Sequence, residues 1–139
     1  IVATLTTILK PGDDGSKITE AVINLFPEAT FDPIEEVSFP SKQNIRIECL
    51  NLSLETFLLQ IRQQAILDTA MDAMAKKLDR NTTEFSISRL AAFANKIAFT
   101  YEEVPLGGCI TIQLEGPGLG DWIEAVTWHN GRQEVPQRY

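Results

Sequence analysis

Residues 54–79 read LETFLLQIRQQAILDTAMDAMAKKLD, a stretch with neither glycine nor proline, and the interpretation of the whole fold depends on it. Leucine, alanine, glutamine and methionine dominate the stretch, and all four are good helix formers. Asn51 and Ser53, directly before it, are residue types that cap a helix N-terminus. We therefore predict one long helix over about residues 53–79, the longest element of the fold.

The apolar side chains of this predicted helix change face along its length. The first half places Leu54, Phe57, Leu58, Ile61 and Ala65 on one stripe, and the second half holds Leu67, Ala70, Met71, Met74 and Leu78. At 100° per residue, the second stripe lies roughly 140° around the cylinder from the first. The shift falls near Gln63 to Ala65. Either the helix bends or breaks there, or its second half packs against another layer of the domain or a partner subunit.

Shorter apolar patterns flank this stretch on both sides. A two-residue period, interrupted by turn residues, predicts strands over residues 1–9, 29–39, 42–50, 82–87, 97–101 and 109–115. Helical spacing predicts helices over residues 16–26, 89–95 and 119–126, the first capped by Ser16 and stopped by Pro27. Strands outnumber helices and are joined mostly by short turns. The sequence therefore predicts a single α+β domain over residues 1–139, with helices packed on a mixed or mostly antiparallel sheet.

The composition is that of an ordinary globular domain. The chain has 139 residues, of which 44% are hydrophobic and 22% charged. No apolar run approaches the ~20 residues of a membrane helix, so we predict no membrane partner. Cys49 and Cys109 lack the spacing of a zinc site or a disulfide framework, and strand alternation places Cys49 in the core. Two unpaired thiols predict a reducing, cytoplasmic location, with a removed targeting segment as the alternative because residue 1 is isoleucine.

The residues that could carry catalysis do not form a recognisable centre. A glycine-rich loop precedes the last predicted helix, but Asp121 stands where a dinucleotide-binding loop needs a small residue. Asp68 and Asp72 share a helix face without a third metal ligand, and His129 is the only histidine. The serines lie at predicted caps, turns and strand ends rather than in a nucleophile elbow. We therefore predict no catalytic residue, no metal site, no small-molecule cofactor and no enzymatic activity.

Charge is distributed unevenly along the chain. Residues 62–96 carry six basic and four acidic residues, whereas the remainder carries six basic and fifteen acidic ones, so the two parts are +2 and −9 within a net charge of −7. A cationic region on an acidic body can bind RNA phosphates, although ordinary solvated surface explains the same pattern. Four aromatic rings interleave with these cations: Phe85, Phe93, Phe99 and Tyr101. Alternation favours burial for most of them, and Tyr101 is the ring we expect to be exposed.

Five segments spread nearly end to end along the chain share one pattern: Leu25–Pro27, Gln63–Ala70, Asn81–Phe85, Ala91–Phe93 with Lys96, and Pro105–Gly107. In these segments the sequence resembles an uncharacterised archaeal protein family described as predicted RNA-binding or exosome-associated. The resemblance implies a fold like that of the ribosomal protein that binds 5S RNA, an α+β sheet with helices on one face. It also implies an arginine where this chain has Gln64. Without that arginine, this chain lacks one residue that could pair with a phosphate, and Asp68 lacks its expected partner. Asp68 is then expected to cap the backbone or to pair with a loop group.

The leading hypothesis is a non-catalytic RNA-binding protein or RNA-processing accessory that contacts structured RNA. Its candidate RNA-binding residues are Lys76, Lys77, Arg80, Arg89 and Lys96. Lys96 matches the resembled family directly, and Arg89 keeps its charge. The alternative is a protein-interaction module without nucleic acid, which forms a homodimer or binds another protein through the second apolar stripe or a free strand edge. An enzyme ranks third.

Overall fold

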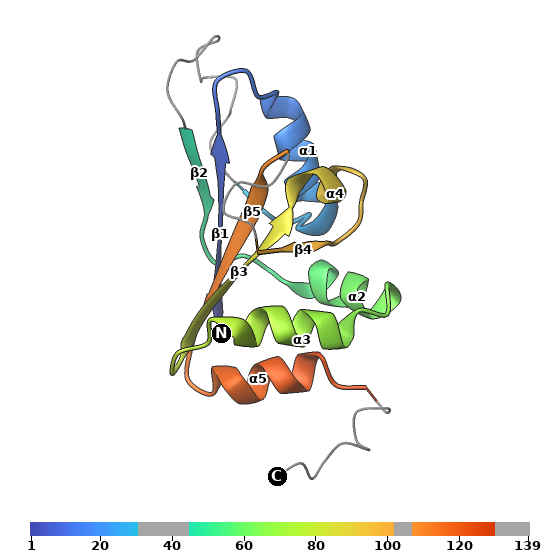
Figure 1. The fold of residues 1–139 in the computed structure, drawn as a ribbon. Coiled ribbons are helices and arrows are strands. Elements are labelled where there is room, and N and C mark those ends of the chain that lie inside the picture. The colour runs from blue at the N-terminus through green and yellow to red at the C-terminus, as the bar shows by residue number, and fades with distance from the viewer. Residues whose placement is uncertain (31–44, 102–106, 130–139) are drawn as a thin grey trace.

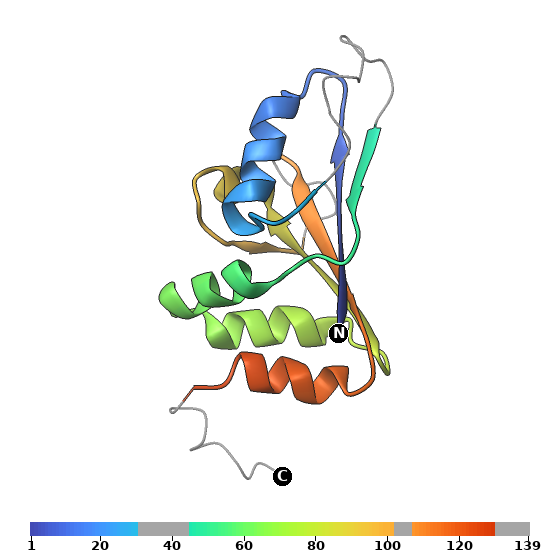
Figure 2. The ribbon, with the colours of Figure 1, turned by 180° about the vertical axis from the view of Figure 1, so that it is seen from behind.

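The sheet of this protein has its helices on one face (Figure 1; seen from behind in Figure 2). The computed structural model describes residues 1–30, 45–101 and 107–129. The strands are β1 (Val2–Leu9), β2 (Ile45–Cys49), β3 (Thr82–Ser88), β4 (Phe99–Thr100) and β5 (Cys109–Glu115). Their order is β2-β1-β5-β3-β4, and each neighbouring pair is antiparallel. The predicted α+β class with a mostly antiparallel sheet is therefore confirmed for the described residues, whereas the likeness to the ribosomal protein stays a prediction.

The helices form two groups on that face. They are α1 (Gly15–Leu25), α2 (Glu55–Gln63), α3 (Leu67–Lys76), α4 (Arg89–Phe93) and α5 (Leu119–Val126). Helices α1 and α4 pack together over one end of the sheet, and α2, α3 and α5 lie side by side over the other end (Figure 1). Within the described residues, no helix is both long and apolar enough to cross a membrane.

Alternation along the central strands builds the core, as the sequence predicts. Leu5 on β1, Ile87 on β3 and Ile112 on β5 are fully buried beneath the helices. The residues between them, such as Thr6 and Thr111, lie on the face that the described helices leave open, where register pairs them across β1 and β5. Side chains alternate between the two faces of a strand, so one face is apolar and the other is rich in hydroxyl groups.

Phenylalanine rings join the helices to the sheet. Phe57 of α2 is 1% exposed. Its ring centroid lies 5.6 Å from that of Phe26, 5.7 Å from that of Phe85 and 6.4 Å from that of Phe99. These separations are those of favourable stacked and edge-on aromatic pairs. Of the three rings near the cations that were expected in the core, Phe85 is buried and Phe99 packs against the core as predicted, but Phe93 on α4 is 39% exposed.

The predicted single helix over residues 53–79 is wrong, because the chain breaks between α2 and α3. Ala65 adopts a left-handed conformation with φ of 58°. The N–H of Ile66 donates to the carbonyl of Ile61 at 3.0 Å, and that of Ala65 donates to Arg62 at 3.1 Å. This pair of bonds is the Schellman motif, which ends a helix and normally has glycine at the left-handed position.

The second apolar stripe is mostly buried inside the chain's own core. Ala70, Ala73 and Met74 of α3 are at most 2% exposed, and the helix packs on β3 and α5. Another layer of the same chain therefore covers most of this stripe, of which Met71 and Leu78 stay partly exposed.

Smaller differences from the predicted elements concern their ends. Asp14 precedes helix α1, and its Oδ1 accepts a hydrogen bond from the N–H of Ser16 at 2.9 Å. The N-cap is therefore Asp14 rather than the predicted Ser16. Strand β4 is shorter than the predicted 97–101. The predicted strand over residues 29–39 and its connection to the next strand fall mostly outside the described residues. Cys49 is 3% exposed, which confirms its predicted place in the core.

Candidate nucleic-acid interface

A groove of about 500 Å³ lies where the end of α3 meets the edge formed by β3 and β4. Lys76 is the last residue of α3 and Lys77 is its C-cap, so both side chains are at the helix end beside the sheet. Pairing of Ser86 with Thr100 aligns β4 against β3, and Tyr101 follows directly. The fold thus brings two of the five predicted RNA-binding residues to one groove, together with an aromatic ring.

Tyr101 is the most exposed ring of this region. It is 60% exposed, which confirms the prediction made from the sequence, and the Lys76 Nζ lies 4.9 Å from its centroid. An ammonium group at this distance is attracted by the ring's electron-rich face, by about 0.5–1 kcal/mol at an exposed site. The contact holds Lys76 and Tyr101 together as a flat, positively charged wall of the groove.

The floor of the groove is lined by hydroxyl groups from three strands. Ser86 of β3 and Thr111 of β5 are partners across the sheet, and their hydroxyl oxygens lie 2.9 Å apart. Thr100 of β4 faces Ser86 on the other side. Hydroxyls both donate and accept hydrogen bonds, so this row can bond to sugar, base or phosphate oxygens. Glu84 and Cys109 complete the polar lining.

Two other predicted RNA-binding residues, Arg80 and Lys96, are exposed but lie in different places. Arg80 is in the turn between α3 and β3, three residues after Lys77, with φ of 60°. Lys96 precedes Ile97, whose N–H and carbonyl both bond to Gln64 at the break between α2 and α3. Because α3 rises about 1.5 Å per residue, Lys96 is a helix length away from the groove. Arg80 therefore follows the groove lysines closely along the chain without lining the groove, and Lys96 lies apart from it.

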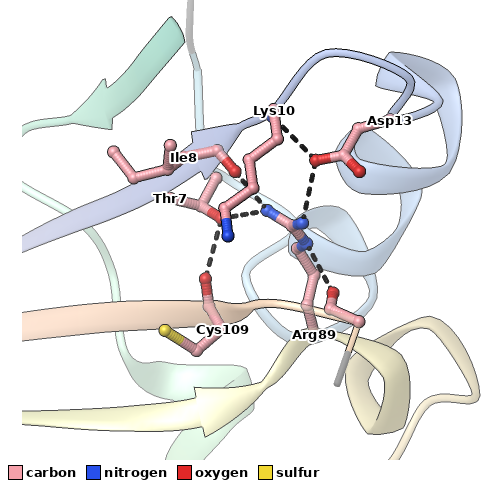
Figure 3. A network of polar contacts seen from close by, with 7 residues as sticks. Thr7, Ile8, Lys10, Asp13, Arg89 and Cys109 are labelled. Carbon is pink, nitrogen blue, oxygen red and sulfur yellow. Dashed lines mark hydrogen bonds and ion pairs between the residues drawn. The ribbon is translucent and has the colours of Figure 1, made fainter. Parts of the chain in front are cut away.

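Arg89, the fifth predicted RNA-binding residue, is not at the surface. It is 7% exposed, and its guanidinium donates to internal oxygens (Figure 3). Its Nη1 lies 2.8 Å from both Thr7 Oγ1 and the carbonyl of Ile8, and its Nε lies 3.1 Å from the carbonyl of Gly107. Its Nη2 forms an ion pair with Asp13 Oδ2 at 3.3 Å. These bonds occupy both sides of the guanidinium, so Arg89 ties β1, the loop at Asp13 and the start of β5 to α4.

A glycine makes room for this buried arginine. Gly108 has φ of +82°, and a Cβ added there would collide with the Arg89 guanidinium. The carbonyl of Gly108 also accepts from the N–H of Arg89 at 3.1 Å. The sequence predicts a turn at Gly107-Gly108. The second role of Gly108, to leave space for the guanidinium, depends on the position of Arg89 and is not visible in the sequence.

The sequence also missed a polar cluster at the start of α3. His129 Nε2 lies 2.9 Å from Asp68 Oδ1, so of the two roles expected for Asp68, capping or pairing with a loop group, it has the second, with a partner that the sequence did not indicate. Arg62 donates to the carbonyls of Trp128 and Val126 at 3.3 and 3.5 Å, where the last carbonyls of α5 attract a cation. No spacing could have revealed these contacts, since Asp68 and His129 are 61 residues apart. The cluster joins the segment after α5 to the helix break.

Gln64 has a structural role at the same break. Its Oε1 accepts from the N–H of Ile97 at 2.8 Å, and its Nε2 donates to the carbonyl of Ile97 at 3.1 Å. The arginine that the family resemblance implies at this position could donate to the carbonyl but could not accept from the N–H. Asp72 lies outside these contacts, and within residues 1–30, 45–101 and 107–129 no three His, Cys, Asp or Glu side chains gather to hold a metal ion.

Comparison with known proteins places the chain in a family. No family model matches it. A UPF0201 protein of Sulfurisphaera tokodaii is 32% identical over 123 residues, which span 86% of this chain and 83% of that protein. A UPF0201 protein of Methanothermobacter thermautotrophicus is 28% identical over 114 residues, which span 80% and 81% of the two chains.

Solved structures share the fold. The structure of a UPF0201 protein from Methanococcus jannaschii matches with a TM-score of 0.75 and 22% identity, over 94% of this chain and 97% of that one. A DUF54 protein from Methanothermobacter thermautotrophicus matches with a TM-score of 0.64 and 13% identity, over 91% and 97%. The solved structures show the shared fold, and the 32% identity over 86% of the chain to the Sulfurisphaera tokodaii protein shows the family: the chain belongs to the UPF0201 family of archaeal proteins.

Proposed function

We propose that this protein binds RNA without catalysing a reaction on it, and that Lys76, Lys77 and Arg80 hold the RNA phosphates. The observation that carries the proposal is the groove in which two lysines lie beside a tyrosine ring that is 60% exposed. Phosphate contacts from cations and stacking on aromatic rings are the two interactions that sequence-tolerant RNA binding combines. The net charge of −7 does not prevent this, because charges beyond about 8–10 Å are largely screened at physiological salt.

The salt dependence of binding tests the proposal. Affinity for a structured RNA hairpin is measured by fluorescence anisotropy over a series of salt concentrations. Each phosphate contact contributes about 1 to the slope of log affinity against log salt. The double variant Lys77→Ala/Arg80→Ala should therefore lower the slope by about 2. Lys17→Ala is the matched control, since Lys17 is an exposed lysine on α1 outside the groove, and its slope should equal that of the wild type.

The result that would refute RNA binding is simple. A wild-type protein that binds no hairpin at low salt, where phosphate contacts are strongest, cannot have this function. Equal slopes for the double variant and the Lys17→Ala control would instead remove the groove from the proposal.

The protein-interaction alternative has less support. One of its two surfaces, the second apolar stripe, is mostly buried against β3 and α5. Light scattering at micromolar concentration distinguishes the two functions. A stable dimer would favour the alternative, and a monomer that binds RNA would favour the proposal.

A further inference from the structure

We infer that the groove holds one unpaired nucleotide of a structured RNA, with its base stacked on Tyr101 and an exocyclic amino group of that base bonded to Glu84. The inference rests on the proposed RNA binding and names the part of the RNA that is recognised. It is drawn from the size of the groove, the exposure of the ring and the presence of an acidic side chain among the lysines.

The shape of the groove favours a single nucleotide over a duplex. Its volume of about 500 Å³ is that of a small-molecule site, since such sites measure about 300–1,000 Å³. A base inside an RNA helix is stacked on both faces and cannot reach Tyr101. Bases in bulges, loops and ends are free to leave the stack, and these are the positions at which proteins place aromatic rings against RNA. The row of hydroxyls from Ser86, Thr100 and Thr111 lies within the same groove for the sugar and the base edge.

Glu84 is the feature that points to the identity of the base. It lies on β3 two residues before Ser86 and pairs with Gln113 of β5 across the sheet. A carboxylate repels a phosphate, so a groove built only for phosphates gains nothing from it. A carboxylate accepts hydrogen bonds from the amino groups of cytosine and adenine, and uracil has no such group. Lys76 and Lys77 then serve the phosphate while Glu84 serves the base.

The first experiment compares two RNA hairpins that differ only by one bulged cytidine. The wild type should bind the bulged hairpin more tightly. Tyr101→Leu should weaken binding of the bulged hairpin by about 5- to 150-fold, the range of base stacking on an aromatic ring, and leave the paired hairpin unchanged. Tyr101→Phe should restore the preference because it keeps the ring. Phe93→Leu on α4 is the matched control for loss of an exposed ring, and it should change neither affinity.

The second experiment measures occupancy of the groove itself. Cys109 lines the groove and is partly exposed, whereas Cys49 is 3% exposed and serves as an internal control. The rate at which a maleimide labels Cys109 should fall when the bulged hairpin is bound and should not change with the paired hairpin. Free cytidine monophosphate, at the same concentration as the RNA, should give no protection. Protection by the mononucleotide equal to that by the bulged hairpin would overturn RNA as the source of the nucleotide.

The identity of the bulged base completes the test. Hairpins with bulged cytidine or adenosine should bind more tightly than one with bulged uridine, and Glu84→Gln should reduce that difference. Equal binding of all three would overturn the role of Glu84. Equal binding of bulged and paired hairpins, with Cys109 labelled at the same rate in both, would overturn the inference while RNA binding stands. Absence of any binding at low salt would refute the proposed function itself.

Discussion

The two arginines of the predicted RNA-binding set should respond oppositely to substitution. Arg89→Ala removes the donor to Thr7, Ile8 and Gly107 and the ion-pair partner of Asp13, contacts that are buried or partly buried. Arg80→Ala removes an exposed side chain in a turn. We expect Arg89→Ala to lower the free energy of unfolding strongly, and Arg80→Ala to lower RNA affinity with little effect on stability.

The magnitude for Arg89→Ala follows from what its removal leaves behind. Three internal oxygens lose a charged donor, and a hydrogen bond to a charged group contributes about 1.5–3 kcal/mol. These contributions do not add fully, because water enters the vacated site and reaches Asp13, whose side chain is 30% exposed. Loss of one member of a buried charge pair costs about 3–5 kcal/mol, and we take that range. An exposed position such as Arg80 should stay within about 0.5 kcal/mol of the wild type.

Urea unfolding followed by circular dichroism measures the difference. With a slope of about 2 kcal/mol per molar urea, a loss of 3–5 kcal/mol lowers the midpoint by about 1.5–2.5 M. If Arg89→Ala unfolds within about 0.3 M of the wild type, the buried network contributes little to stability. If Arg89→Ala keeps its stability but loses as much RNA affinity as Arg80→Ala, Arg89 contacts RNA after all.

Two further predictions concern left-handed backbone positions, and urea unfolding checks both. Gly108→Ala places a Cβ against the buried guanidinium and should lower the free energy of unfolding clearly more than the control Gly118→Ala, where φ is also positive but no atom lies within 4 Å. The control should lower it by about 1 kcal/mol. Equal losses of stability in the two variants would mean that the guanidinium moves aside freely. Ala65→Gly should raise the free energy of unfolding by about 0.5–1 kcal/mol because glycine adopts the φ of 58° without strain, and a loss of stability would contradict the helix-ending role of this residue.

The regular elements of the fold were predictable where burial follows a simple period. The helix over residues 119–126 and the strand over 109–115 coincide with α5 and β5, since each buries one regular face. The break at Ala65 was not predictable from residue type, because no glycine or proline marks it. The only sign of it in the sequence is the shift of the apolar stripe. That shift is explained equally well by a bend or break in the helix and by packing of its second half against another layer. The left-handed Ala65 and the hydrogen bonds that end α2 there decide for a break, and the contacts of Gln64 with Ile97 hold it in place.

The candidate site was predictable in part. Lys76 and Lys77 are exposed because they end an amphipathic helix, and Tyr101 is exposed because β4 stops before it. Arg89 looked equivalent to Arg80 in the sequence, since a charged residue after a strand is usually solvated. Its burial depends on oxygens from Thr7 and Gly107, which no local pattern connects with it.

The strand order has a consequence for how the protein is made. Strand β1 lies between β2 and β5 and hydrogen-bonds to β5 across 102 residues of chain, from Thr7 to Cys109. A ribosome that adds about 5–20 residues per second leaves β1 without this neighbour for roughly 5–20 s. During that interval β1 can pair with β2, but its other edge stays unpaired and open to association with other nascent chains. Completion of the sheet centre is therefore timed by translation, and slowing of synthesis between β2 and β5 should increase aggregation of this chain in cells.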